Sequence, residues 1–261
     1  MKIQLDDKVI VITGGSEGIG AEIAKTCAAC GARVGILSRD QDEMQSVVDA
    51  IKAQGGQAMW AEADVTEDDQ VKQAVEQVAA QWGRIDGLVA NAGTNGTWAP
   101  IDELSPEDWR MTLDVNLTGT FFAIRHAAPH LKKQGGSIVV MSSINGTRTF
   151  SNSGASAYAA SKAGQFALAK MLALELAQDK VRVNVICPGA IESAIHEKTE
   201  REDLDSIRTP VEYPEGQIPL IDGAMGDPQQ VANLTAFLLG DLSAHITGTP
   251  VWIDGGQSLI R

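Results

Sequence analysis

Short apolar runs alternate with segments of helical periodicity along the chain. Most of the runs lack an alternation of polar and apolar residues, which is typical of parallel strands covered by helices on both sides. They predict seven strands, at residues 8–13, 33–37, 57–62, 86–90, 136–141, 181–186 and 250–253. Apolar residues at helical spacing predict helices at residues 18–30, 42–53, 68–82 and 157–177, among others. The expected fold class is α/β: a doubly wound, mostly parallel seven-stranded sheet with helices on both faces, the Rossmann fold.

No linker or internal repeat divides the sequence, so a single domain of residues 1–261 is expected. One segment, at about 190–226, is charged, contains three prolines and lacks periodicity. It follows a strand end, where open α/β sheets bind ligands, and it predicts a substrate lid made of a long loop or of short helices. Four of its residues either reach the substrate pocket or only pack the lid: Ile195, Ile207, Tyr213 and Ile218.

Charge and composition restrict the partners and the location of the protein. The formal net charge is -13, and no run of Lys and Arg interrupts it, which disfavours nucleic acid and membrane partners. The first apolar stretch is too short to span a membrane and lacks the cleavage site of a secretory signal, so a cytoplasmic location is expected. Cys27 and Cys30 form a C-x-x-C pair, which is either a redox pair or part of a buried helix face. Their apolar spacing with Ile23 favours the buried face.

A glycine-rich turn, T-G-G-S-E-G-I-G from Thr13 to Gly20, follows the first predicted strand and begins a helix. Glycine permits a tight turn, and the free N–H groups at the start of the helix favour a dinucleotide pyrophosphate. The same kind of turn also occurs where nothing binds, but the strand-turn-helix context favours a phosphate site. Six residues of the turn are therefore expected to bind a dinucleotide: Gly14, Ser16, Glu17, Gly18, Ile19 and Gly20.

Tyr158 and Lys162 form a Y-x-x-x-K motif on a predicted helix, where residues four apart lie on one face. A tyrosine hydroxyl has a pKa near 10 and exchanges its proton poorly at neutral pH. A nearby ammonium group stabilises the phenolate and lowers that pKa, which predicts that Tyr158 acts as a general acid/base.

The turn T-G-x-x-x-G-I-G, together with Y-x-x-x-K, resembles the short-chain dehydrogenase/reductase family over essentially the whole chain. Ser143 after the fifth predicted strand and Asn116 in the preceding helical segment complete a set similar to the family's Asn-Ser-Tyr-Lys residues. The resemblance implies that Ser143 bonds the substrate oxygen and that Lys162 also binds the nicotinamide ribose. It further implies that Asn116 holds a water that links Lys162 to solvent, and that the protein is a homotetramer.

Other positions match the cofactor contacts of the same family. The resemblance implies an adenine contact at Asp64 and Val65, after the third predicted strand. On the adenosine side it implies further contacts at Asn91, Ala92 and Gly93, after the fourth predicted strand. On the nicotinamide side it implies contacts at Pro188, Gly189, Ile191 and Ser193, after the sixth predicted strand.

One departure from the family lies between Ser143 and Tyr158, which are two positions further apart than is common there. The loop 145–156 is expected to absorb the insertion, and Ser142 is a second candidate for the serine role. Thr147, Arg148 and Phe150 are expected to shape the substrate pocket. Arg148 either binds an anionic substrate or is a solvated loop residue, and the second interpretation is favoured.

The end of the second strand distinguishes NAD from NADP. An acid there bonds the ribose 2′-hydroxyl, whereas an arginine accommodates a 2′-phosphate. Ser38 and Arg39 occupy this position and favour NADP, although Glu17 and Asp40 bring negative charge nearby. NADP is therefore the expected cofactor and NAD the alternative.

The combined motifs predict an NAD(P)-dependent oxidoreductase that transfers hydride between nicotinamide and a carbonyl or secondary alcohol carbon, with a small neutral ketone, sugar or polyol as substrate. No metal site is expected, since no Cys/His cluster supports His126 and His130. A non-catalytic dinucleotide-binding regulator is disfavoured, because Tyr158 and Lys162 are both present. A 3-oxoacyl thioester reductase is the nearest alternative, disfavoured by the net charge and by five acidic residues: Glu197, Glu200, Glu202, Asp203 and Asp205.

Overall fold

A seven-stranded sheet forms the centre of the protein, in a computed structural model that describes residues 2–193, 199–207, 218–221 and 223–260. The strand order is β3-β2-β1-β4-β6-β7-β9, and every neighbouring pair is parallel. The strands are β1 (Val9–Thr13), β2 (Arg33–Ser38), β3 (Gln57–Glu62), β4 (Gly87–Ala90), β6 (Gly136–Met141), β7 (Val181–Pro188) and β9 (Pro250–Ile253). The doubly wound fold predicted from the apolar runs is confirmed, and the sheet is entirely parallel.

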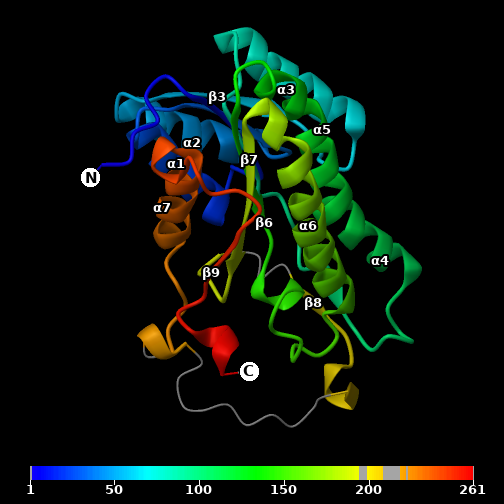
Figure 1. The fold of residues 1–261 in the computed structure, drawn as a ribbon. Coiled ribbons are helices and arrows are strands. Elements are labelled where there is room, and N and C mark those ends of the chain that lie inside the picture. The colour runs from blue at the N-terminus through cyan, green and yellow to red at the C-terminus, as the bar shows by residue number, and fades with distance from the viewer. Residues whose placement is uncertain (1, 194–198, 208–217, 222, 261) are drawn as a thin grey trace.

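Helices cover both faces of this sheet (Figure 1). One layer contains α1 (Gly18–Ala29), α2 (Gln41–Ala53) and α7 (Pro228–Leu239), which pack on one hydrophobic cluster. The other layer contains α3 (Asp68–Trp82), α5 (Gly119–Leu131) and α6 (Ser156–Glu175), with α4 (Pro106–Leu113) against α6. The chain therefore buries both sides of each central strand.

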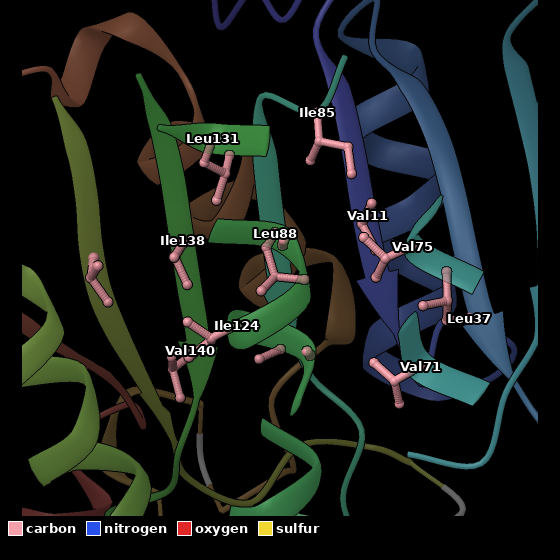
Figure 2. Packing of buried hydrophobic residues seen from close by; sticks show 14 of the residues in the cluster. Val11, Leu37, Val71, Val75, Ile85, Leu88, Ile124, Leu131, Ile138 and Val140 are labelled. Atoms are coloured by element: carbon pink, nitrogen blue, oxygen red, sulfur yellow. The ribbon is translucent and has the colours of Figure 1, made fainter. Parts of the chain in front are cut away.

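Alternate residues of β1 illustrate how the core divides between the two layers. Val9 and Val11 belong to the cluster under α3, α5 and α6, whereas Ile10 and Ile12 belong to the cluster under α1, α2 and α7. All four side chains are fully buried. Figure 2 shows Val11 and residues from neighbouring strands and helices converging on the first cluster. Because helices cover both faces of the sheet, the sequences of its strands are continuous apolar runs.

The strand order reverses direction between β1 and β4. From β1 the chain first proceeds to β2 and β3, and it then returns to add β4, β6, β7 and β9 on the other side. Two crossover connections leave in opposite directions at this point, which opens a crevice beyond the carboxyl ends of the strands. The glycine-rich turn follows β1 directly at this crevice.

Some elements were not predicted from the sequence. β5 (Thr97–Trp98) and β8 (Glu200–Arg201) pair in a separate two-stranded sheet, and two residues are too few to show a periodicity. The segment after β7 contains two short 3₁₀-helices in its described parts, η5 (Leu204–Ile207) and η6 (Pro219–Ile221). Ile195, Glu197 and Tyr213 lie outside the described residues.

The cysteine pair lies where the buried-face interpretation expected it. Cys27 is fully buried in α1, Cys30 is half-buried at the end of that helix, and both are free thiols. Burial raises the pKa of the Cys27 thiol, which keeps it protonated and unreactive. Among the described residues, no helix is both long and apolar enough to cross a bilayer.

Candidate active site

The glycine-rich turn brings the end of β1 and the start of α1 into close contact. Gly14 and Gly18 have positive φ angles of 63° and 51°, a conformation that favours glycine. A Cβ on Gly20 would overlap the Gly14 carbonyl oxygen and lie 2.6 Å from the Asn91 amide nitrogen. Glu17 is the N-cap residue of α1, but its side chain makes no capping hydrogen bond. The first N–H groups of α1 thus lack a side-chain cap, which fits an anionic pyrophosphate.

The turn after β4 is hydrogen-bonded to the glycine-rich turn. Asn91 Nδ2 donates to the carbonyl oxygens of Thr13 at 3.1 Å and Gly14 at 3.0 Å. The Asn91 and Ala92 backbone N–H groups both donate to Thr13 Oγ1 at 3.1 Å. The structure therefore brings Asn91 and Ala92 beside the glycine-rich turn, with the side chain of Asn91 holding that turn.

Gly93 connects this turn to the expected catalytic residues. A Cβ on Gly93 would lie 3.1 Å from Asn116 Oδ1 and 3.3 Å from Lys162 Nζ. The absence of a side chain at Gly93 thus leaves space directly beside the lysine ammonium group. This space adjoins the crevice at the reversal of strand order, where a nicotinamide dinucleotide fits in this type of sheet.

Asn116 lies in a π-helical turn, η1 (Asp114–Thr118), which interrupts the helix between α4 and α5. Its side chain accepts from Thr94 N at 2.7 Å and donates to Thr94 O and Ser161 Oγ, each at 2.9 Å. Its backbone carbonyl accepts from Gln165 Nε2 and Thr120 Oγ1, each at 2.7 Å. Single π-helical turns are common at functional sites, and this one directs Asn116 toward Gly93 and Lys162.

Lys162 is buried, and its ammonium group donates to Met141 O at 2.9 Å. Burial lowers the pKa of Lys162 to about 8, an effect opposed by the nearby Cys187. Its Nζ lies 5.6 Å from the centre of the Tyr158 ring. The two members of the Y-x-x-x-K motif thus share one face of α6, as predicted from their spacing.

The hydroxyl group of Tyr158 lies near the side chain of Ser143. Burial raises the pKa of Tyr158, although the nearby Ser143 hydroxyl acts in the opposite direction. The net lowering expected from Lys162 is not found in this structure, because burial has the larger effect. At neutral pH the phenol is therefore protonated and holds a proton that it can donate.

The two adjacent serines differ in their contacts. Ser142 Oγ is buried and donates to the Lys162 carbonyl oxygen at 2.8 Å. Ser143 Oγ accepts from Asn145 N at 3.1 Å, and the Ser143 side chain lies near enough to the Tyr158 hydroxyl to lower its pKa. Ser143 is thus the serine that faces the tyrosine, whereas Ser142 supports the backbone of α6.

The end of β2 gathers four polar residues of the expected adenosine side. Ser16 Oγ lies 3.1 Å from Ser38 Oγ, which joins the glycine-rich turn to the strand end. Arg39 is largely exposed and lies 3.6 Å from Asp64, measured between Nη1 and Oδ2. Burial raises the pKa of Asp64, but hydrogen bonds from Thr66 and the nearby Arg39 outweigh it and bring the pKa below its usual value. Val65, next to Asp64, is buried and packs where α5 begins at Gly119.

Sequence reasoning missed Glu43, in the first turn of α2. Ser16 Oγ donates to Glu43 Oε2 at 3.0 Å, so a carboxylate joins the Ser16–Ser38 pair. Glu43 is four positions beyond Arg39, and only the direction of α2 turns it back toward the glycine-rich turn. The signal in the sequence was an acid in the first turn of a helix that directly follows the second strand.

The segment after β7 lies beside the glycine-rich turn. Pro188 ends β7 in a buried position, and Gly189 N donates to Ile253 O at 3.1 Å. Ile191 is buried and forms an isolated parallel bridge with Gly226. A Cβ on Gly18 would lie 3.4 Å from the Cβ of Ser193. The predicted nicotinamide-side residues and the phosphate-side turn therefore adjoin each other.

The loop between Ser143 and Tyr158 lines a cavity of about 310 Å³. Phe150 and Ile207, both exposed, contribute apolar walls, while Asn145 and Thr149 contribute buried polar groups. Arg148 is not part of this lining; its guanidinium stacks 3.6 Å from the centre of the Trp252 ring. The stacking on β9 accounts for Arg148 without an anionic ligand.

Thr147 and Ile218 have packing roles in the same region. Trp252 Nε1 donates to Thr147 Oγ1 at 3.0 Å, which ties the loop to β9. Ile218 is buried against the turn at Gly255, so this residue packs the segment that carries it.

The two histidines bond carboxylates across the α3–α5 contact. His126 Nε2 lies 2.6 Å from Asp68 Oδ1, and His130 Nε2 lies 3.2 Å from Glu76 Oε1. No group of three or more His, Cys, Asp and Glu residues in the described part of the chain is arranged to hold a metal ion.

A Rossmann-type sheet, an uncapped glycine-rich turn at its crevice, and an adjoining Tyr-Lys-Ser cluster define a dinucleotide-dependent oxidoreductase. The chain matches, over residues 14–258, a family model described as Enoyl-(Acyl carrier protein) reductase. It is 36% identical to the 3-oxoacyl-(acyl-carrier-protein) reductase FabG of Thermotoga maritima, covering 97% of this chain and 99% of that protein. It is also 36% identical to 3beta-hydroxysteroid dehydrogenase 1 of Eggerthella lenta, covering 98% and 95%.

A solved structure of a 3-ketoacyl-ACP reductase from Sinorhizobium meliloti 1021 superimposes with a TM-score of 0.93. Its sequence is 47% identical, and the match covers 97% of this chain and 100% of that one. The chain belongs to the short-chain dehydrogenase/reductase family. It is an NAD(P)-dependent oxidoreductase of carbonyl or alcohol groups, as the sequence predicted.

The lowered pKa of Lys162 predicts a pH dependence of stability. Between about pH 8, the pKa in the fold, and the higher pKa of the unfolded chain, the unfolded state binds more protons at this residue. The stability that a wild-type lysine contributes relative to Lys162→Met should therefore rise by about 2 kcal/mol from pH 7.5 to pH 10. Urea unfolding of both proteins across this range measures the difference.

Lys170→Met is the matched control, since Lys170 is exposed on the same helix. Its difference from wild type should stay constant over the same range. A difference for Lys162→Met that stays equally constant would contradict the lowered pKa.

Proposed function

We propose that this protein interconverts a carbonyl compound and its alcohol with Asn116, Ser143, Tyr158 and Lys162 as the catalytic set. The observation that carries the proposal is the grouping of three side chains: Ser143 influences the pKa of the Tyr158 hydroxyl, and the buried Lys162 lies on the same helix face as Tyr158. Two hydroxyl groups that face one point suit a substrate oxygen, because one donates a hydrogen bond while the other exchanges a proton.

The cofactor is held by residues at the ends of β1, β2, β3, β4 and β7 and by Lys162 on α6. The uncapped turn from Gly14 to Gly20 takes the pyrophosphate, while Asn91, Ala92 and Gly93 and the segment from Pro188 to Ser193 flank the ring systems. A bound nicotinamide dinucleotide supplies the hydride in reduction and accepts it in oxidation. Lys162, beside the open space at Gly93, bonds the nicotinamide ribose.

Tyr158 handles the proton. In reduction its phenol gives its proton to the substrate oxygen as the carbonyl carbon gains hydride. Oxidation is the reverse step and needs the phenolate, which is the minor form at neutral pH, to take the proton from the alcohol. A pKa of Lys162 near 8 allows this residue to exchange protons at physiological pH, and it restores the proton of Tyr158 after reduction. Asn116 holds the water that connects Lys162 to solvent.

NADP is the proposed cofactor in preference to NAD. Arg39 follows Ser38 at the end of β2 and is largely exposed, so its guanidinium can move from Asp64 to a 2′-phosphate. A planar guanidinium bonds a phosphate through two hydrogen bonds at once. The contact of Arg39 with Asp64, at 3.6 Å, is a weaker interaction, so a phosphate can replace it.

The proposed substrate is a small neutral ketone, sugar or polyol. Within the described residues, the cavity beside the Ser143–Tyr158 loop is lined by apolar and uncharged polar side chains. A 3-oxoacyl thioester is the second candidate, favoured by the names of the Thermotoga and Sinorhizobium relatives. The exposed acids Glu200, Glu202, Asp203 and Asp205 oppose it, because they would repel an acidic carrier protein.

The proposal extends to the assembly and organisation of the chain. Residues 1–261 form one domain in which the segment 190–226 is a lid over the substrate, and Ile207 lines the cavity from that segment. Met171 and Leu174 are large apolar side chains exposed on α6, which supports a homotetramer that includes this helix. Three free cysteines are consistent with a cytoplasmic location.

Tyr158→Phe tests the proposed function directly. Removal of the hydroxyl removes the exchangeable proton, so kcat should fall about 10²–10⁴-fold. Binding of NADPH should remain close to wild type, since the ring is retained. Turnover on a panel of ketones, sugars, polyols and acyl thioesters, with parallel nucleotide titrations, gives both values. Full turnover of the variant on every substrate would contradict the mechanism.

The two serines provide a matched pair. Ser143→Ala removes the hydroxyl that faces Tyr158, and we expect kcat to fall about 10²-fold. Ser142→Ala removes the hydrogen bond to the Lys162 carbonyl, and we expect it to reduce stability by about 1 kcal/mol with a much smaller loss of kcat. Steady-state kinetics and urea unfolding distinguish the two. A larger loss of kcat in Ser142→Ala would assign the role to Ser142 instead.

Arg39→Ala tests the cofactor preference. We expect the ratio of NADPH to NADH affinity to fall about tenfold, since the variant lacks the guanidinium fork for the 2′-phosphate. Arg110→Ala, which removes an exposed arginine on α4, should leave the ratio unchanged. Fluorescence titrations with both nucleotides measure the ratio. An unchanged ratio in Arg39→Ala would contradict the assignment of NADP.

A further inference from the structure

Glu43 places a carboxylate beside Ser16 and Ser38, at the carboxyl end of β2. Its Oε2 accepts a hydrogen bond of 3.0 Å from Ser16 Oγ, which itself lies 3.1 Å from Ser38 Oγ. Ser16 belongs to the glycine-rich turn and Ser38 ends β2, so the three side chains surround the carboxyl end of that strand. In dinucleotide-binding sheets this strand end is where the 2′ group is recognised.

The position of Glu43 is fixed by the start of α2. Asp40 is the N-cap residue of this helix, and its side chain accepts from the backbone N–H of Glu43 at 2.9 Å. The cap starts the helix directly after β2, so the first turn directs the half-buried Glu43 side chain back over Ser16. Asp42, its neighbour in the same turn, is exposed and has no such contact with Ser16 or Ser38.

Among the described residues, no lysine, arginine or histidine forms an ion pair with the Glu43 carboxylate, and the nearby Arg39 lies against Asp64 instead. The strand end thus presents the Glu43 carboxylate and two hydroxyl groups, while Arg39 lies against the Asp64 carboxylate and Asp40 caps the helix. A carboxylate accepts a hydrogen bond from a 2′-hydroxyl, whereas it repels a 2′-phosphate.

We propose that Glu43 is a specificity-determining residue that favours the 2′-hydroxyl of NAD and limits the preference of this enzyme for NADP. Glu43 thereby takes, from the first turn of α2, the role of the acid that the end of β2 lacks. Arg39 and Glu43 act in opposite directions on the 2′ group, so the enzyme binds both nucleotides with modest discrimination. This inference rests on the proposed dinucleotide site and deepens it.

Glu43→Gln tests the role of the charge, because glutamine keeps the size of the side chain and can still accept from Ser16. We expect NADPH to bind about tenfold more tightly in this variant relative to NADH, with the affinity for NADH equal or slightly weaker. Asp42→Asn is the matched control, since it removes one negative charge from the same helical turn. Its nucleotide ratio should remain that of the wild type. Fluorescence titrations of all three proteins with NADPH and NADH measure the dissociation constants without turnover.

The possible outcomes separate this inference from the proposed function. A shift of the ratio toward NADPH in Glu43→Gln, with no shift in Asp42→Asn, supports the inference. This holds even if the wild type prefers NADH, since that result would overturn only the proposed NADP preference. An unchanged ratio in Glu43→Gln, an equal change for both nucleotides, or an equal shift in Asp42→Asn would overturn the inference and leave the dinucleotide site intact. Failure of the wild type to bind either nucleotide would overturn both.

Discussion

The close approach of the β1 and β4 turns is the constraint on which the site depends. Gly20 has no room for a side chain, since a Cβ there would overlap the Gly14 carbonyl oxygen. Asn91 fills the remaining space and bonds the carbonyl oxygens of Thr13 and Gly14. Both turns leave the carboxyl ends of adjacent parallel strands, so the sheet brings together residues that are nearly eighty positions apart. Four hydrogen bonds thereby hold the proposed pyrophosphate-binding turn against the turn after β4.

Burial sets the chemistry of the catalytic cluster. Lys162 is enclosed between α6 and the end of β6, and the loss of water lowers its pKa to about 8. The same loss of water raises the pKa of the Tyr158 hydroxyl, which keeps the phenol protonated. An acid that retains its proton and an amine that titrates near neutral pH form a matched pair for proton delivery. In the proposed mechanism, the position of the cluster in the core therefore matters as much as its residue types.

Charge at the adenosine side is distributed over three elements. Arg39 and Asp64 approach each other from the ends of β2 and β3, while Glu43 approaches Ser16 from α2. Each element places its charged group at the same end of the sheet, because parallel strands all end there. In the proposed cofactor site, the balance between Arg39 and Glu43, rather than a single residue, sets the preference between a 2′-hydroxyl and a 2′-phosphate.

The apolar runs and the motifs of the sequence by themselves determined the parallel sheet, the glycine-rich turn and the Y-x-x-x-K face. These features are local: burial on both faces removes alternation from a strand, and helical spacing alone brings Tyr158 and Lys162 together. Only the tertiary structure decided which serine faces Tyr158, the stacking of Arg148 on Trp252, and the approach of Glu43 to Ser16. Each of these contacts joins residues from separate elements, and their geometry depends on how the elements pack. Burial also reversed the expected shift of the Tyr158 pKa, because desolvation is a property of the folded core that no spacing of residues records.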